Sequence, residues 1–125
     1  MDSLELAHRC VEIALEKKCS DILLLDVRER TVLADYFVVC TARNKRQLKA
    51  IADGVARETP RPKGRARHVE GADGAKWVLM DLGDVVIHVF DPDARIFYDL
   101  ESLWADAPRV PLKELIEAAK AGQPS

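Results

Sequence analysis

Two aspartates, one histidine and one cysteine are the side chains of this sequence that could take a chemical role. Asp81 ends one apolar run and Asp84 precedes the next, so the two carboxylates flank a tight turn. Carboxylates in this position could hold a magnesium ion for phosphoryl or nucleotidyl transfer. Aspartates that stabilise a turn through local hydrogen bonds are the more common case. The sequence has no phosphate-binding loop of the G-x-x-x-x-G-K-[ST] type, which favours the turn interpretation.

His88 could act as a general base and Cys40 as a nucleophile. His88 lies inside an apolar run, which favours a hydrogen-bonded structural histidine. Cys40 ends another apolar run without a basic neighbour in sequence to lower its pKa, so a buried, inert thiol is expected. The histidines fall at no metal-ligand spacing and the serines in no nucleophile motif. We therefore expect a protein that is not an enzyme and needs no metal or cofactor.

The three cysteines, Cys10, Cys19 and Cys40, are an odd and widely spaced set. Such a set argues for a reducing compartment and against a disulfide framework. The sequence also lacks a recognisable signal peptide and an apolar run of membrane-spanning length. We therefore expect a soluble, cytoplasmic protein.

Aromatic residues gather around the segment that carries the two aspartates. Between residues 81 and 106, seven acidic residues stand against one base, Arg95. Trp77, Phe90, Tyr98 and Trp104 cluster in sequence around this acidic segment. Tryptophan and tyrosine are favoured interface anchors, and an acidic surface suits a basic protein partner because it repels nucleic-acid phosphates. The alternative is that Trp77 and Phe90 are core residues; we favour it for Phe90 and leave it open for Trp77.

Opposite charges are concentrated in different parts of the chain. The 125 residues carry 19 Lys and Arg against 21 Asp and Glu, a net charge of −2, yet residues 43–67 hold nine bases and two acids. This asymmetry favours steered association with a charged macromolecule, although an ordinary solvated surface is the alternative. Residues 60–67, PRPKGRAR, could form a contact arm or a plain solvated connector.

A hairpin is the element that positions the candidate residues. The runs 77–81 and 85–90 are separated by Leu82-Gly83-Asp84, and glycine accepts the positive φ that hairpin turns require. The second run is apolar on both faces, which predicts a strand inside the sheet with both sides covered.

The rest of the chain predicts one mixed five-stranded sheet flanked by helices, in the α+β or mixed α/β class. Residues 21–27 are predicted as a buried strand and residues 33–41 as its antiparallel, central neighbour, while residues 68–70 could form a short strand. Predicted helices are 3–18, capped by Asp2 or Ser3; 44–58, capped by Asn44 with Gln47; and 111–121. The link 105–110 looks loosely attached. We therefore expect a domain at 1–107 and a C-terminal extension with a short helix at 108–125.

One long motif of the sequence is specific. It combines W-x₃-D-x-G-D-x₃-H-x-F with a following Y-x-L-E-x-L-W, and either part alone is weak. The segments that belong to the same pattern are DI at 21–22 with LDV at 25–27, DYFVVCT at 35–41, RQ at 46–47 with AIAD at 50–53, VEG at 69–71, WVLMDLGDVVIHVF at 77–90, Arg95 and YDLESLW at 98–104. In this combination the chain resembles the RsfS/Iojap family of ribosomal silencing factors.

The resemblance implies a translation repressor that is often a homodimer. Members of the family bind the large ribosomal subunit through its protein uL14 and sterically block subunit joining under nutrient limitation and in stationary phase. Their fold is nucleotidyltransferase-like without the catalytic residues. The contact residues that the motif match implies here are Trp77, Asp81, Leu82, Gly83, Asp84, His88, Tyr98, Leu100 and Trp104. A peripheral contact with ribosomal RNA is expected at Arg61, Lys63, Arg65 and Arg67. The alternative function is a metal-dependent nucleotidyl or phosphoryl transferase that uses the hairpin carboxylates.

Overall fold

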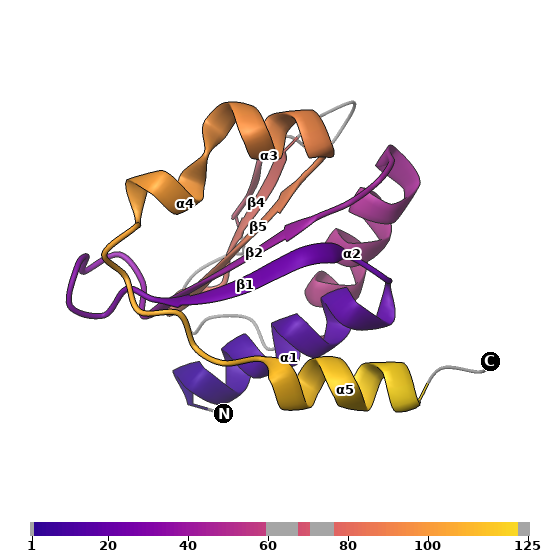
Figure 1. Cartoon of the computed structure of the whole chain (residues 1–125), viewed down its shortest axis with the longest axis horizontal. Helices are drawn as coiled ribbons and strands as arrows, with labels where there is room; N and C mark the ends of the chain where they lie inside the picture. Colours follow the sequence, from indigo (N-terminus) through magenta and orange to yellow (C-terminus); the bar gives the residue numbers. More distant parts are fainter. Residues whose placement is uncertain (1, 60–67, 71–76, 123–125) are drawn as a thin grey trace.

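One mixed sheet separates two layers of helices in the computed structural model, which describes residues 2–59, 68–70 and 77–122 (Figure 1). The strand order is β1-β2-β5-β4-β3. The elements in chain order are α1 (Ser3–Glu16), β1 (Ser20–Asp26), β2 (Tyr36–Thr41), α2 (Lys45–Glu58), β3 (His68–Glu70), β4 (Trp77–Asp81), β5 (Val85–Phe90), α3 (Pro92–Tyr98), α4 (Leu100–Leu103) and α5 (Lys113–Ala121).

The two central strands, β2 and β5, run parallel to each other and are buried at every position. The other pairs, β1 with β2, β4 with β5 and β3 with β4, are antiparallel. The predicted inner position of residues 85–90 and the predicted antiparallel pairing of the first two strands are therefore confirmed. β2 begins at Tyr36 rather than at residue 33, because Val32 and Leu33 are exposed in the preceding loop.

The predicted strand at residues 21–27 is present as β1, but within β1 the prediction that it is buried is correct only for Leu24 and Leu25, because β1 lies at the edge of the sheet and its first residues are exposed. The outer side of β1 is covered by the link that precedes α5. The Asp26 backbone N–H donates to the Pro108 carbonyl at 2.8 Å, and the Val110 N–H donates to the Leu24 carbonyl at 2.8 Å. The expectation of a loosely attached link is therefore wrong: these hydrogen bonds fix residues 108–110 along the strand.

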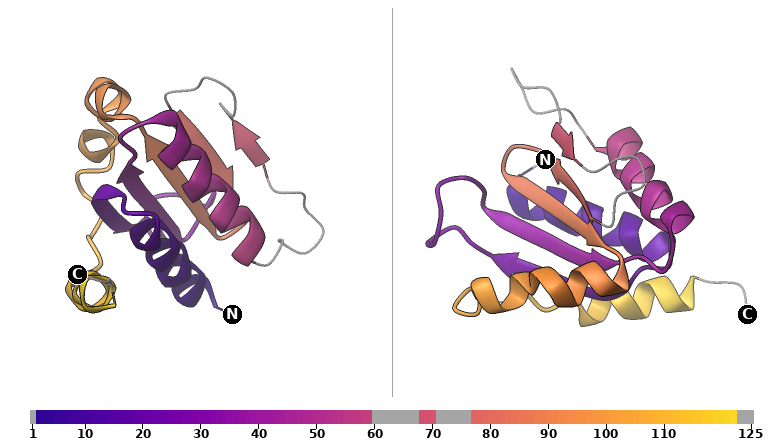
Figure 2. Two further views of the ribbon diagram at one scale, coloured as in Figure 1. Left: turned by 90° about the vertical axis from the view of Figure 1, so that its right-hand side faces the viewer. Right: turned by 90° about the horizontal axis from the view of Figure 1, so that it is seen from above.

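Each face of the sheet has its own hydrophobic core. The larger core lies between the sheet and α1, α2 and α5, and the smaller one lies on the side of α3 and α4 (Figures 1 and 2). The alternation of strand side chains distributes residues between them, so that Val38 and Cys40 of β2 face the larger core and Phe37 and Val39 face the smaller.

Both predicted helix caps are confirmed. The Asp2 carboxylate accepts a hydrogen bond from the Glu5 backbone N–H at 2.8 Å, and the Asn44 side-chain oxygen accepts one from Gln47 N–H at 2.9 Å. The Gln47 side-chain oxygen also accepts from the Arg43 N–H at 2.6 Å, and its amide nitrogen donates to the Lys17 and Lys18 carbonyls. Gln47 therefore links the start of α2 to the end of α1.

The mixed α+β class, with one mixed sheet flanked by helices, is confirmed. Likeness to nucleotidyltransferases and a domain boundary at residue 107 stay predictions. Among the described residues, no helix is both long and apolar enough to cross a membrane.

Candidate functional site

The turn between β4 and β5 is built by its own side chains. The Asp81 carboxylate accepts a hydrogen bond from the Gly83 backbone N–H at 2.8 Å, and Gly83 has the positive φ of 97° that the sequence predicted. Leu82 is buried in the larger core, and its N–H donates to the Val85 carbonyl at 2.9 Å. The turn interpretation of Asp81 is therefore supported.

Asp84 joins this turn to the neighbouring part of the sheet through its backbone. The Asp84 carbonyl accepts hydrogen bonds from the Asp35 N–H at 2.7 Å and the Tyr36 N–H at 3.2 Å, while the residue itself is exposed. Within the described ranges, no group of three or more His, Cys, Asp or Glu side chains could hold a metal ion. The arrangement gives the metal-dependent transferase alternative no support.

Five rings from distant parts of the chain form a continuous row on the side of the sheet that carries α3 and α4. We call this row, Trp104–Phe37–His88–Trp77–Tyr98, the aromatic row. The ring centroids are 5.0 Å apart for Trp104 and Phe37, 5.1 Å for Phe37 and His88, 5.8 Å for His88 and Trp77, and 4.9 Å for Trp77 and Tyr98. Aromatic pairs at these separations contribute beyond the area that they bury, so the row connects α3 and α4 to the strands.

His88 lies in the middle of the aromatic row as a neutral imidazole. Its side chain is 5% exposed, and burial lowers its pKa to about 4. The His88 Nδ1 accepts a hydrogen bond from the Trp77 indole N–H at 3.3 Å, so the imidazole proton is on Nε2. Nε2 is buried without a hydrogen-bond partner among the described residues. This environment agrees with a structural histidine rather than a general base, because a base needs access to its substrate.

Cys40 is fully buried, and its pKa is raised well above the ordinary value by its hydrogen bond to Cys19 and by burial. A thiol that keeps its proton is a poor nucleophile. The structure therefore agrees with the expectation that Cys40 is not a catalytic residue.

β4 presents a half-exposed column of side chains beside the aromatic row. Burial alternates along the strand: Val78 and Met80 are buried on the side of the larger core, whereas Trp77, Leu79 and Asp81 are half-buried on the opposite side. The two short helices α3 and α4 therefore leave part of this side of the sheet open to solvent. Trp77 is both a member of the aromatic row and a surface residue. The sequence had left open whether Trp77 is a core residue or an interface anchor, and its position in the structure is compatible with both roles.

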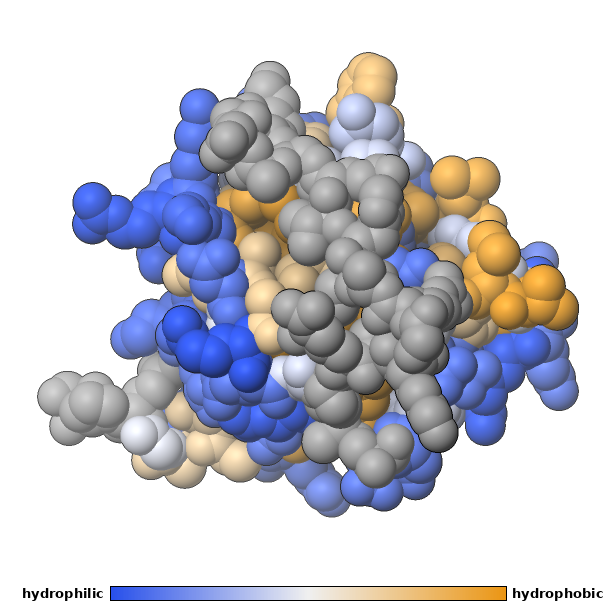
Figure 3. Space-filling view, turned by 180° about the vertical axis from the view of Figure 1, so that it is seen from behind, coloured by the Kyte–Doolittle hydropathy of each residue, from blue (hydrophilic) through white to orange (hydrophobic). Residues whose placement is uncertain are grey.

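Next to this column, α3 and α4 expose large apolar side chains. Ile96, Phe97 and Leu103 are 78%, 79% and 76% exposed, and Tyr98 is 46% exposed. We call these four residues the apolar patch. Figure 3 shows the molecule from behind, where hydrophobic residues gather toward the side that carries α4 and the loop between β1 and β2. Exposed apolar side chains of this size on neighbouring helices are typical of protein-binding surfaces.

Residues 81–106, which include the apolar patch, are rich in exposed acidic side chains, and the one basic residue of the segment is turned inward. Arg95 is bound to Glu101 at 2.6 Å and donates to the Thr41 hydroxyl at 2.9 Å, with only 11% of its side chain exposed. Exposed acidic residues of this region are Asp84, Asp93, Asp99 and Asp106. The surface of this segment is therefore negatively charged, as the sequence predicted.

The structure brings some of the predicted contact residues together and separates others. Trp77, His88, Tyr98 and Trp104 share the aromatic row, and Leu100 packs against the same core. The turn residues 81–84 lie at the far end of the β4–β5 hairpin from Trp77, roughly 13 Å away at about 3.3 Å per residue. The predicted RNA-contacting residues Arg61, Lys63, Arg65 and Arg67 lie outside the described residues.

Four residues were missed by the sequence interpretation: Ile96, Phe97 and Leu103 of the apolar patch, and the buried Phe37 of the aromatic row. The exposure of Ile96 and Phe97 follows from the structure, in which α3 buries only Ala94. Phe37 gave no signal in the sequence, because its contacts with His88 and Trp104 exist only in the folded chain.

Known proteins resemble this chain over nearly its whole length. A family model described as "Ribosomal silencing factor during starvation" matches residues 1–125. A ribosomal silencing factor from Halalkalibacterium halodurans is 37% identical over 93% of this chain and 99% of its own length, and one from Bacillus subtilis is 44% identical over 74% and 79%. The crystal structure of a protein from Chromobacterium violaceum has a TM-score of 0.75 and 36% identity, covering 84% of this chain and 88% of its own.

Proposed function

Because this chain belongs to the family of ribosomal silencing factors, which are ribosome-associated translation regulators, we propose that it represses translation by preventing ribosome assembly. It binds the large ribosomal subunit through the protein uL14 and sterically blocks the joining of the small subunit when nutrients are limiting, as in stationary phase. This mechanism needs a binding surface and no catalytic residue or cofactor.

The observation that carries the proposal is the combination of the half-exposed β4 column with the apolar patch beside it. Trp77 and Tyr98 belong to both the surface and the aromatic row, so they are large anchors held rigidly from behind. Rigid aromatic anchors lose little conformational entropy on binding, which favours them as hot spots. The exposed acidic residues of the same segment suit a basic partner, because complementary charges accelerate association and exclude wrong partners.

The predicted contact residues fall into two groups under this proposal. Trp77, Asp84, Tyr98, Leu100 and Trp104 contact the partner from the surface of the hairpin, α3 and α4. The remaining four act mainly by holding that surface in shape: Asp81, Leu82, Gly83 and His88. Leu82 and His88 are buried, and Asp81 and Gly83 form the turn hydrogen bond.

We also propose that the free protein is a homodimer and that it resides in the cytoplasm. Basic residues outside the acidic surface make a peripheral contact with ribosomal RNA. The proposed RNA-contacting residues are Arg61, Lys63, Arg65 and Arg67. The described part of the basic segment supports an RNA contact, because Arg43, Lys45 and Arg46 are exposed around the start of α2. A single monomeric mass in light scattering across a concentration series would reject the homodimer.

A pair of charge reversals tests the acidic part of the surface. We expect Asp84→Lys to weaken binding to isolated large subunits about tenfold, which corresponds to about 1.4 kcal/mol. The backbone carbonyl of Asp84 carries its structural hydrogen bonds, so the fold should survive the substitution. Glu114→Lys on α5 is the matched control, because Glu114 is an exposed acid away from α3 and α4 and its reversal should leave binding unchanged. Co-sedimentation measures both; equal weakening by the two variants would reject a specific acidic contact.

The apolar part of the surface has its own test. Phe97→Ser removes an exposed side chain of the apolar patch, and we expect it to weaken binding by at least about tenfold, as hot-spot substitutions do. Leu4→Ser is the control, because Leu4 is also an exposed apolar residue but lies on α1, on the opposite side of the sheet. If Phe97→Ser binds the large subunit as tightly as the wild type, the apolar patch is not the contact.

A further inference from the structure

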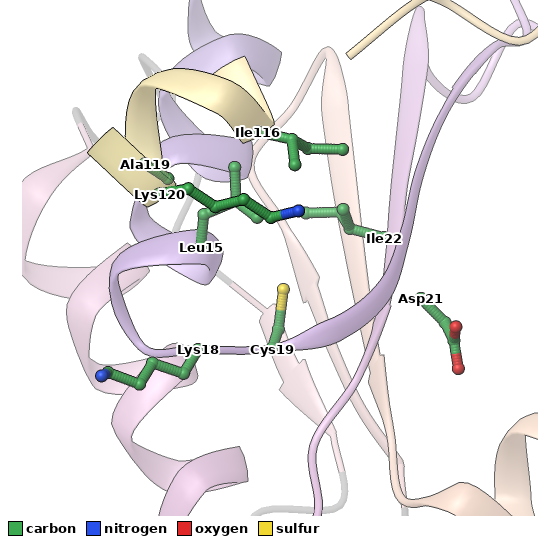
Figure 4. A pocket seen from close by; sticks show the side chains of 8 residues that line it. All are labelled: Leu15, Lys18, Cys19, Asp21, Ile22, Ile116, Ala119 and Lys120. Atoms are coloured by element: carbon green, nitrogen blue, oxygen red, sulfur yellow. The ribbon is translucent and has the colours of Figure 1, made fainter. Parts of the chain in front are cut away.

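A groove beside α5 gives solvent access to one cysteine. The cavity has a volume of about 470 Å³ and lies where the end of α1 and the start of β1 meet α5. Cys19 lies at its floor, half-buried, and Figure 4 shows its thiol pointing toward Leu15 and Lys120. The side chains that line the groove are Leu15, Lys18, Cys19, Asp21, Ile22, Ile116, Ala119 and Lys120. A small polar molecule can therefore reach the Cys19 sulfur without unfolding of the protein.

A second thiol, that of Cys40 on β2, lies close to Cys19. Ser20 is paired with Thr41 in the antiparallel β1–β2 ladder, so Cys19 and Cys40 flank that pair as diagonal neighbours on the side of the larger core. The chain departs from regular strand geometry here, with positive φ values at Lys18 (64°) and Asp21 (49°) and an irregular register after Ser20. In this arrangement each of the two thiols shifts the pKa of the other.

The two thiols have opposite electrostatic properties. The hydrogen bond from Cys40 and the nearby Arg95 guanidinium lower the pKa of Cys19, although burial and Asp21 act in the other direction. The pKa of Cys40 is raised by the same hydrogen bond, by burial and by the neighbouring thiols. Cys19 is therefore the more nucleophilic thiol of the pair, and Cys40 is the thiol that holds its proton more tightly. Arg95 is fixed near the thiols by its bonds to Glu101 and Thr41.

We propose that Cys19 is an oxidation site for peroxides that enter the groove, and that Cys40 converts the oxidised Cys19 into a reversible disulfide. The Cys19 thiolate attacks one oxygen of hydrogen peroxide, the O–O bond breaks, and the departing hydroxide takes up a proton to become water. Oxidation turns Cys19 into a neutral sulfenic acid and so removes the neighbouring thiolate charge that raises the pKa of Cys40. The Cys40 sulfur then attacks the Cys19 sulfur, the S–O bond breaks, and the hydroxyl leaves as a second water with the Cys40 proton. Two thiols lose two electrons and two protons, and one peroxide is reduced to two waters.

This site is independent of the proposed ribosome contact. Cys40 faces the larger core, on the side of the sheet opposite the aromatic row, and the groove borders α1 and α5 rather than α3 and α4. A disulfide would fasten the start of the edge strand β1 to β2 while leaving the apolar patch unchanged. Failure of the ribosome-binding proposal therefore does not affect the oxidation test.

Peptide mapping of the intact wild-type protein is the first test, because trypsin places Cys10, Cys19 and Cys40 in three different peptides. The reduced protein is treated with hydrogen peroxide, quenched, unfolded, alkylated with N-ethylmaleimide and digested. We expect one cross-linked species that joins the Cys19 and Cys40 peptides, disappears on reduction and leaves Cys10 fully alkylated. A Cys10–Cys40 bridge, or full alkylation of all three cysteines after excess peroxide, overturns the proposal.

Variants separate the roles of the two cysteines. In Cys40→Ser, we expect peroxide to leave Cys19 as a sulfenic acid that dimedone traps, whereas Cys10→Ser, the matched control for a buried thiol, should still form the cross-link.

Because Cys40→Ser could fail to fold, alkylation rates of the folded wild type provide a second measurement. Cys19 should react with iodoacetamide at least about tenfold faster than Cys10, whose pKa is raised to about 12 by burial. Equal rates for these two thiols overturn the assignment of Cys19 as the nucleophile.

Discussion

His88 contributes to stability as a neutral ring inside the aromatic row. The free energy of unfolding should therefore depend on pH through the protonation of this one side chain. Its pKa is about 4 in the folded protein, below the ordinary value of 6.5. Between these two values the unfolded chain binds a proton that the folded protein does not bind. The stability of the folded protein should therefore fall as the pH is lowered from 6.5 to 4 and change no further through this group below 4.

We expect this loss to be about 3 kcal/mol, at about 1.4 kcal/mol for each pKa unit. Urea denaturation of wild type and His88→Phe at neutral pH and at several values down to pH 4 measures it. The carboxylates titrate in both proteins, so the difference between their pH profiles isolates His88. A difference that stays constant with pH would show that burial does not lower the pKa of His88.

Gly83 is the residue on which the β4–β5 turn depends. Its φ of 97° is unfavourable for any residue with a Cβ, so Gly83→Ala should destabilise the protein by about 1–2 kcal/mol. Gly122→Ala at the end of α5 is the matched control, because Gly122 has a φ of −81° and alanine adopts that conformation without strain. Thermal denaturation of both variants measures the effect, and equal melting temperatures would contradict this role for Gly83.

The roles of the turn residues could be predicted from the sequence, whereas the ring contacts of His88 could not. The turn at Asp81 and Gly83 was predictable, because both the hydrogen bond and the backbone conformation are local. The burial of His88 was predictable from the apolar run around it. Its ring neighbours Phe37 and Trp77 were not predictable as partners, because strand pairing brings them to it.

The link before α5 and its first residues are structural elements of the domain. Residues 108–110 cover the edge of β1, and Leu112, 8% exposed, packs in the larger core immediately before α5. An uncovered edge strand is a site for pairing with other chains. The attachment of α5 therefore protects the sheet as well as contributing to the core.

Substitution of Leu112 tests this attachment. We expect Leu112→Ala to lower the free energy of unfolding by about 2–3 kcal/mol, because it removes buried methyl groups and leaves a cavity. Leu103→Ala is the matched control; its side chain is 76% exposed, and the loss should stay within about 0.5 kcal/mol. Urea denaturation compares the two, and an equally small effect of both variants would mean that the α5 segment contributes little to the core.

At the level of elements, strong local patterns were predictable and edge positions were not. The apolar stripe and the N-cap of α2 predicted this helix correctly. The apolar run of β5 correctly predicted a strand inside the sheet. β1 was expected to be buried because its composition is apolar, yet its place at the edge of the sheet is a property of the topology. The hydrogen bonds of residues 108–110 to β1 join segments that are distant in sequence, so the pattern of the link alone could not predict them.

The whole molecule has two unlike sides. One side carries α3, α4 and the half-exposed β4 column, with exposed apolar residues on the helices, and the other carries α1, α2 and α5 over the larger core. The acidic character of the first side was predictable from charge counting along residues 81–106. The exposure of Ile96, Phe97 and Leu103 was not predictable in the same way, because it depends on how little of α3 and α4 the sheet covers.

The central claim is that this protein prevents the two ribosomal subunits from joining while bound to the large one. Sucrose-gradient sedimentation of purified large and small subunits, each alone and then mixed, with and without the protein, tests it most directly. We predict stoichiometric binding to the large subunit only. The amount of joined ribosomes should fall in proportion to the fraction of large subunits that carry the protein. Joined ribosomes that form normally with the protein still bound would contradict occlusion, and absence of binding to either subunit would contradict the proposed function itself.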